Sequence, residues 1–258
     1  TITAYLSVAP KAAGFAMLIR FFNIVFGDSS ALASESWQAL NHIPWPQLMG
    51  VLAAATMIVG NLVAIQQKSV KRMLAYSSIA HAGYMMMALP LMSEAGVYGI
   101  MMYLLMYLFM NLGAFFVVIT VQNKTGGETF DDYKGLGWEM PMIGIVMTIF
   151  MVSLTGLPPT AGFIGKFYIF ASLIKGGNEF YWLVMIGGIN SVISLFYYLR
   201  VVKVMYFEGE SHEKIVQPPT VMAALLLATA IPTVLLGVYW TPIADWVQRS
   251  LVFFIQTL

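Results

Sequence analysis

The chain has 258 residues, of which 59% are hydrophobic and only 10% are charged. Because soluble domains are about one quarter charged, this composition excludes a disordered chain, a nucleic-acid-binding protein and a typical soluble enzyme. Thirteen basic and twelve acidic residues nearly cancel, so the net charge of +1 points to no class of partner. Apolar stretches repeatedly reach the roughly 20 residues that a bilayer crossing needs. The sequence therefore predicts an all-α polytopic membrane protein.

In chain order, the apolar runs predict about seven transmembrane helices in a single membrane domain, residues 1–258. They lie at about 3–26, 47–66, 70–91, 96–121, 140–175, 179–205 and 219–242. The tail 243–258 alternates polar and apolar residues, which predicts an interfacial helix with Trp246 and Arg249 at headgroup level. The chain opens inside an apolar segment without an initiator methionine, so we expect an N-terminal truncation.

Segment 140–175 is long enough for two crossings, but glycine and proline interrupt its middle. The interrupting residues are Gly156, Pro158, Pro159 and Gly162, which are unlikely to continue a helix. One broken crossing places eight lysines and arginines on one side of the membrane and two clearly on the other, whereas two crossings give seven against three. The positive-inside rule therefore favours one crossing, broken within the membrane, with the basic loops in the cytoplasm.

Three ionisable side chains fall inside the predicted helices: Lys11, His81 and Lys166. Each lies about nine or ten residues, roughly 15 Å of helix, from the nearest end or flanking charge, so all three are expected near the midplane. All twelve acidic residues fall in loops or at helix ends, so the core is expected to contain no carboxylate. A charge in hydrocarbon is costly and marks a functional site by default. We predict that these three residues form a proton pathway.

Other polar residues are predicted to support this pathway: Ser77, Ser78, Tyr107, Asn111 and Asn190. The alternative is that the amides and hydroxyls only hold helices together, and that His81 only hydrogen-bonds a neighbouring helix. Burial disfavours the charged form of a lysine and a nearby carboxylate restores it, so a lysine with a movable partner can hold and release a proton.

Two local features accompany the two lysines. Lys166 follows the break in its helix, where the positive end of the second half-helix opposes a cation and freed backbone groups can hold water. Pro10 precedes Lys11 and leaves the Leu6 carbonyl without its helical donor, which favours hydration there. The chain contains no cysteine, no metal-ligand set and no nucleophile paired with a base, so we predict no metal site and no catalytic residue.

Two stretches carry a family resemblance. They read KRMLAYSSIAHAGY over 71–84 and LTGLPPTAGFIGKFY over 154–168, and the chain resembles the antiporter-like subunits of respiratory complex I. The resemblance implies the second half of a fourteen-helix protein built from two inverted five-helix repeats. It also implies that Lys11 is the central-axis lysine and Lys166 the lysine of the second broken helix, while the family's glutamate–lysine pair lies in the other half.

The resemblance further implies a proton-translocating membrane subunit of an NADH-quinone oxidoreductase, in the bacterial inner (cytoplasmic) membrane. Its partners would be the other membrane subunits and the lipid bilayer, with no nucleic acid. NADH, flavin, iron–sulfur clusters and quinone are expected in partner subunits, because this chain has no cofactor motif. Alternatives are a subunit of a multisubunit Na⁺/H⁺ antiporter, or a structural membrane subunit whose lysines only serve assembly.

Overall fold

The computed structural model of the chain describes residues 2–26, 44–91, 93–209 and 217–256. These residues form helices and one isolated β-bridge, between Ser69 and Thr129. The α-helices are α1 (Ile2–Leu6), α2 (Ala9–Phe26), α3 (Trp45–Ile65), α4 (Val70–Met86), α5 (Glu94–Thr125), α6 (Leu136–Glu139), α7 (Pro141–Thr155), α8 (Ala161–Lys175), α9 (Tyr181–Phe207), α10 (Thr220–Val238) and α11 (Thr241–Gln256). Short 3₁₀ turns are η2 (Leu89–Leu91), η3 (Phe130–Tyr133) and η4 (Asn178–Phe180).

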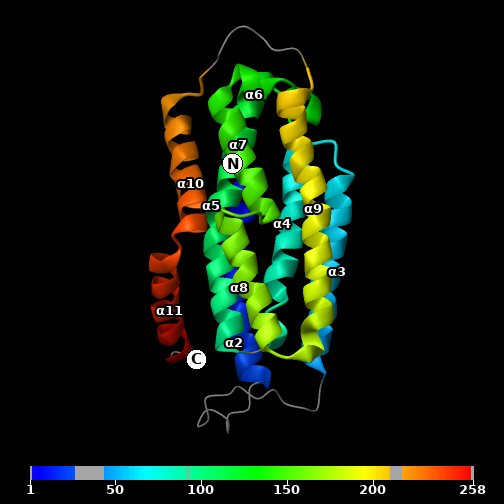
Figure 1. The fold of residues 1–258 in the computed structure, drawn as a ribbon, viewed down its shortest axis with the longest axis vertical. Helices are drawn as coiled ribbons and strands as arrows, with labels where there is room; N and C mark the ends of the chain where they lie inside the picture. The colour runs from blue at the N-terminus through cyan, green and yellow to red at the C-terminus, as the bar shows by residue number, and fades with distance from the viewer. Residues whose placement is uncertain (1, 27–43, 92, 210–216, 257–258) are drawn as a thin grey trace.

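The long helices run along the longest axis of the molecule and form an all-α bundle (Figure 1). Five helical segments of the described residues are long and apolar enough to cross a membrane alone: Ile2–Val25, Trp45–Ile65, Glu94–Thr125, Asn178–Phe207 and Thr220–Val238. A sixth candidate joins Pro141–Thr155 to the preceding segment Phe130–Glu139, from which it is bent by 118°. The protein is therefore a polytopic membrane protein, and the predicted seven segments are compatible with its helices.

The break predicted in segment 140–175 is confirmed. Helix α7 ends at Thr155, and the next residue, Gly156, has a left-handed φ of 89° that suits glycine. Helix α8 begins at Ala161. Figure 1 shows α7 in the upper part of the bundle and α8 in the lower part, with the chain passing onward in the same direction. The segment is thus one crossing made of two half-helices.

The first crossing is also interrupted, between α1 and α2. Ser7 and Val8 separate the two helices, and Pro10 occupies the first turn of α2. Proline has no N–H to donate to the carbonyl of Leu6, which agrees with the expected interruption. Lys11 follows directly, so each of the two lysines lies close to a break in its own helix.

Helix α11 continues below α10 along the same side of the bundle (Figure 1). It packs against α5, burying Val247 and Leu251, and leaves Trp246 exposed. The interfacial position predicted for residues 243–258 stays a prediction, and residues 257 and 258 lie outside the described part of the chain.

Contacts between residues 69–71 and Glu128 join two loops outside the long apolar helices. They lie at what we call the basic end of the bundle, where most of the lysines and arginines are found. The backbone of Val70 donates to the Glu128 carbonyl, and Lys71 Nζ lies 3.1 Å from Glu128 Oε2. Ser69 Oγ also donates to the same carboxylate, at 3.2 Å. The hydrogen bond from Lys71 lowers the pKa of Glu128 below its usual value.

Glu128→Gln is expected to weaken the dependence of folding stability on pH. A carboxyl group whose pKa is lowered by folding contributes stability above its unfolded pKa, and that contribution is lost as the pH falls through the lower folded pKa. As the pH falls from 7 to below the lowered pKa of Glu128, the free energy of unfolding should therefore decrease by up to about 1 kcal/mol more in the wild-type protein than in the variant. Thermal unfolding in detergent measures the difference, with Glu179→Gln at the opposite end as the control for lost charge. Parallel curves for wild type and Glu128→Gln would contradict it.

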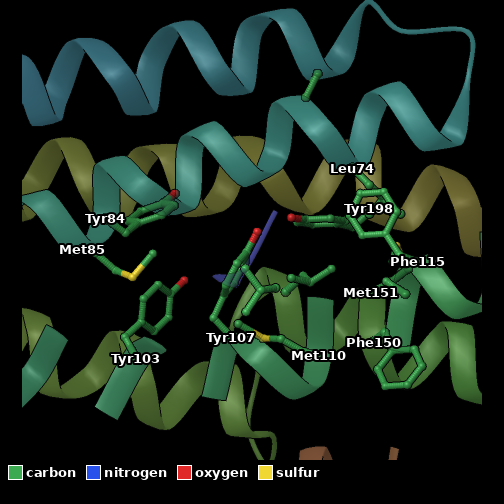
Figure 2. Close-up of a cluster of buried hydrophobic side chains, with 14 of the residues drawn as sticks. Leu74, Tyr84, Met85, Tyr103, Tyr107, Met110, Phe115, Phe150, Met151 and Tyr198 are labelled. Atoms are coloured by element: carbon green, nitrogen blue, oxygen red, sulfur yellow. The ribbon is translucent and has the colours of Figure 1, made fainter. Parts of the chain in front are cut away.

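The core contains an unusual number of buried tyrosines. Six of the largest side chains that are almost fully inaccessible are tyrosines: Tyr84, Tyr103, Tyr107, Tyr133, Tyr197 and Tyr198. A buried tyrosine hydroxyl needs a hydrogen-bond partner, because leaving it unpaired is costly. Four of these hydroxyls point toward a common space in the middle of the bundle, as Figure 2 shows for Tyr84, Tyr103, Tyr107 and Tyr198.

Candidate functional site: a polar array inside the bundle

Lys166 lies in α8, with 5% of its surface exposed. Its ammonium group donates to the Thr155 carbonyl at 2.8 Å and to Ser191 Oγ at 3.0 Å. The same nitrogen lies 4.4 Å from the centroid of the Tyr84 ring, within the range of a cation–π contact. One carbonyl, one hydroxyl and one aromatic face therefore surround the amine.

The break between α7 and α8 creates the carbonyl that binds Lys166. In a continuous helix the Thr155 carbonyl would accept from residue 159, but Pro159 has no N–H. The lysine replaces that missing donor. It also lies at the carbonyl end of α7, where the helix dipole favours a cation. The unfavourable effect expected from the positive end of α8 on this cation is outweighed. Lys166 is the sixth residue of α8, and the dipole effect fades beyond the first turn.

Lys11 has a closely similar environment on the other side of the array. Its ammonium group donates to the Ser78 carbonyl of α4 and lies 3.5 Å from the hydroxyl of Tyr107. It lies 5.0 Å from the centroid of the Tyr107 ring. Each lysine thus contacts one carbonyl, one hydroxyl and one tyrosine ring.

His81 lies between the two lysines and is 2% exposed. Its Nδ1 is 2.6 Å from the hydroxyl oxygen of Tyr103, and its Nε2 is 2.9 Å from that of Tyr198. The rings of Tyr107 and Tyr84 lie 5.1 and 5.9 Å from the imidazole ring, centroid to centroid. The histidine therefore contacts tyrosines from its own helix α4 and from α5 and α9.

These contacts define what we call the polar array: Lys11, His81, Tyr84, Tyr103, Tyr107, Lys166, Ser191 and Tyr198. Tyr107 links Lys11 to His81, and Tyr84 links His81 to Lys166 through its ring and through Ser191 Oγ, which is 3.3 Å from the Tyr84 hydroxyl. Among the described residues no aspartate or glutamate is buried, as expected from the sequence. The acidic residues Asp28, Glu35, Glu210 and Glu213 lie outside the described part of the chain.

The five predicted supporting residues divide into two groups. Ser78 and Tyr107 contact Lys11 directly. The other three do not contact a lysine. Ser77 Oγ donates to the Leu74 carbonyl of its own helix and lies within hydrogen-bonding reach of the Tyr198 side chain. Asn111 donates to Ser7 Oγ, and Asn190 Oδ1 accepts from Asn61. Asn190 therefore joins α9 to α3, and Asn111 joins α5 to the α1–α2 break.

Sequence reasoning did not rank four members of the array as site residues. They are Tyr84, Tyr103, Ser191 and Tyr198. Tyr84 follows His81 by three residues and Tyr103 precedes Tyr107 by four, so both share a helix face with a predicted residue. Tyr198 and Ser191 come from a different helix, α9, and their proximity depends on packing rather than on local spacing.

A cavity of about 260 Å³ adjoins the broken helix. Phenylalanine side chains form much of its wall, and its lining residues include Thr155, Gly156, Lys166, Phe167 and Ser191. A side chain at Gly156 would place its Cβ 2.8 Å from Lys166 Cδ, so the glycine leaves room for the lysine. Of the predicted break residues, Gly156 thus borders the array, and Gly162 packs against α7.

The bundle, its interrupted crossings and its two lysines define a class of protein: an antiporter-like polytopic membrane subunit. The chain belongs to the NADH:quinone oxidoreductase/Mrp antiporter transmembrane family, whose model matches residues 1–194. It is 52% identical over 251 residues to NADH-quinone oxidoreductase subunit N 2 of Sorangium cellulosum, a match covering 96% of this chain and 48% of that protein. The chain spans about half the length of the curated relatives it matches.

Solved structures show the same fold. A chain of Thermus thermophilus respiratory complex I with bound aureothin is 31% identical, with a TM-score of 0.66, over 78% of this chain and 45% of that one. A chain of the membrane-bound sulfane sulfur reductase, an archaeal respiratory membrane complex, is also 31% identical. Its TM-score is 0.75, over 82% of this chain and 42% of that one.

Proposed function

We propose that the polar array conducts protons between Lys11 and Lys166, in a membrane subunit of an NADH-quinone oxidoreductase. The observation that carries the proposal is the pair of lysines, each of which lies at a helix break. Hydroxyl and imidazole groups lie between the two lysines. Among the described residues, no buried carboxylate accompanies them. A buried amine in these surroundings is costly as an ammonium and is therefore suited to releasing a proton.

The relay would proceed through groups that both give and take protons. A tyrosine or serine hydroxyl donates one hydrogen bond and accepts others, and an imidazole has one nitrogen of each kind when neutral. Both tyrosines lie beside His81: Tyr107 on the side of Lys11, and Tyr84 on the side of Lys166. Their rings lie more than 5 Å from the imidazole centroid, so water would complete the path between these groups.

The rest of the assembly would supply the redox chemistry. NADH, flavin, iron–sulfur clusters and quinone would be held by partner subunits, and quinone reduction there would drive the protons through this chain. The partners would be the other membrane subunits of the complex and the lipid of a bacterial inner membrane. The support is that the relatives of this chain are named as subunits of NADH-quinone oxidoreductases from bacteria.

Lys11→Ala tests the proposal in inverted membrane vesicles that contain the assembled complex. Proton uptake per NADH oxidised is expected to fall, because a positioned proton-transfer group typically accelerates transfer by about 100-fold or more. Lys68→Ala, which removes an exposed lysine at the basic end, is the matched control and should leave uptake unchanged. Undiminished proton uptake by an assembled Lys11→Ala complex would overturn the proposal.

A second candidate is a subunit of a multisubunit Na⁺/H⁺ antiporter, because the family description covers Mrp antiporters. Sodium-dependent proton transport without NADH or quinone would favour it. A purely structural subunit is distinguished by assembly: lysine variants would then fail to assemble, whereas variants of a proton pathway assemble and fail to transport.

A further inference from the structure

Both nitrogens of His81 face tyrosine hydroxyls, and this limits the states of the ring. A neutral imidazole has one N–H donor and one bare acceptor nitrogen. One of the two hydroxyls must therefore donate to the ring while the other accepts from it. Both tyrosines are fully buried, so neither hydroxyl can exchange its partner with bulk water.

The two contacts differ in length. The distance between Tyr103 Oη and Nδ1 is 2.6 Å, and that between Tyr198 Oη and Nε2 is 2.9 Å. Bonds donated by a hydroxyl are typically shorter than those donated by an N–H group, whose usual length is about 2.9 Å. The lengths thus favour a hydroxyl donor at Nδ1 and an N–H donor at Nε2.

We propose that Tyr103 and Tyr198 are positioning residues that hold His81 in its Nε2–H tautomer. Tyr103 donates to Nδ1, and Nε2–H donates to Tyr198. The two bonds come from different helices, α5 and α9, and they also fix the plane of the ring relative to Tyr107 and Tyr84. The role of His81 in proton transfer rests on the proposed function, but the hydrogen-bond pattern does not.

Nitrogen magnetic resonance tests the pattern in the assembled complex. With ¹⁵N-labelled histidine, the signals of His81 are found by their loss in His81→Gln. We expect Nε2 to resonate as a protonated nitrogen and Nδ1 as a bare one that accepts a hydrogen bond. Tyr103→Phe should shift the Nδ1 signal most, and Tyr198→Phe the Nε2 signal most.

Tyr133→Phe is the matched control. Tyr133 is equally buried, but it lies in η3, and its hydroxyl has no hydrogen-bond partner among the described residues. Its removal should leave both nitrogen signals of His81 in place. Two results would overturn the proposal: a wild-type ring protonated at Nδ1 alone, or His81 nitrogen signals that shift in neither Tyr103→Phe nor Tyr198→Phe.

Proton transport gives a second readout. An unpaired buried polar group costs about 1–3 kcal/mol, so losing either hydroxyl is expected to slow transfer through His81 about 5-fold to 150-fold. Tyr133→Phe should not slow it. If the nitrogen signals shift as expected while transport is unchanged, the tautomer assignment stands and the proposed role of His81 fails, so the two failures are distinguishable.

Discussion

Lys166→Ala is expected to slow proton transfer through this chain by about 100-fold or more, while the complex still assembles. The amine that bridges the Thr155 carbonyl and Ser191 Oγ is lost, and no buried carboxylate among the described residues can replace it. The Thr155 carbonyl, deprived of its donor by Pro159, would be left to water in the adjoining cavity. Proton uptake by inverted vesicles, divided by NADH oxidised in the same sample, measures the loss.

Two further variants separate charge from packing. Lys166→Met keeps a long apolar chain without the amine and should lose transport to the same degree. Lys175→Ala removes an exposed lysine from the last turn of the same helix and should transport normally. Normal transport by both Lys166 variants would show that Lys166 carries no protons, and failure of both to assemble would show that it serves structure.

Helix breaks were predictable because glycine and proline act locally. The run from Gly156 to Gly162 was expected to interrupt one crossing. Helix α7 ends at Thr155, just before that run, and α8 begins inside it, at Ala161. The predicted helix ends agreed less well with the structure. Segment 70–91 ends at Met86, since Leu89-Pro90-Leu91 turns into a 3₁₀ helix. Helix α5 extends beyond 96–121 because Ser93 caps its start and polar residues continue it to Thr125, which hydropathy does not register.

The lysines and the histidine of the array were predictable, since charge in an apolar helix is conspicuous. Tyr107 was also predicted, but Tyr84, Tyr103 and Tyr198 were not, because tyrosine rings count as apolar and only packing shows where their hydroxyls point. Asn190 shows what helix spacing leaves open. It was predicted to support the pathway, and in the structure its side chain accepts a hydrogen bond from Asn61 on α3. Depth along a helix follows from the sequence, whereas the direction a side chain faces depends on which helices meet.

Gly162→Ala is expected to destabilise the folded protein by about 3 kcal/mol or more, at the upper end of what overpacking costs. An added Cβ would lie 1.8 Å from the Ser153 carbonyl oxygen, and this neighbour is backbone, which cannot rotate away. The Gly162 N–H also donates to Ser153 Oγ at 3.1 Å, so displacing α8 would break the contact that joins the two half-helices. The amount of folded protein in membranes and its unfolding temperature in detergent measure the effect.

Gly188→Ala is the matched control, because a Cβ there meets no atom within 4 Å and the residue lies inside helix α9. Alanine at that position should leave stability unchanged or slightly raised, since alanine favours the helix by up to about 1 kcal/mol over glycine. Equal stability of Gly162→Ala and Gly188→Ala would contradict the close approach of α8 to α7. If Gly162→Ala folds weakly but still positions Lys166, transport per folded complex should be retained. If it moves α8 away from the Thr155 carbonyl, both stability and transport should fall, because the same break that shapes the fold also holds the lysine.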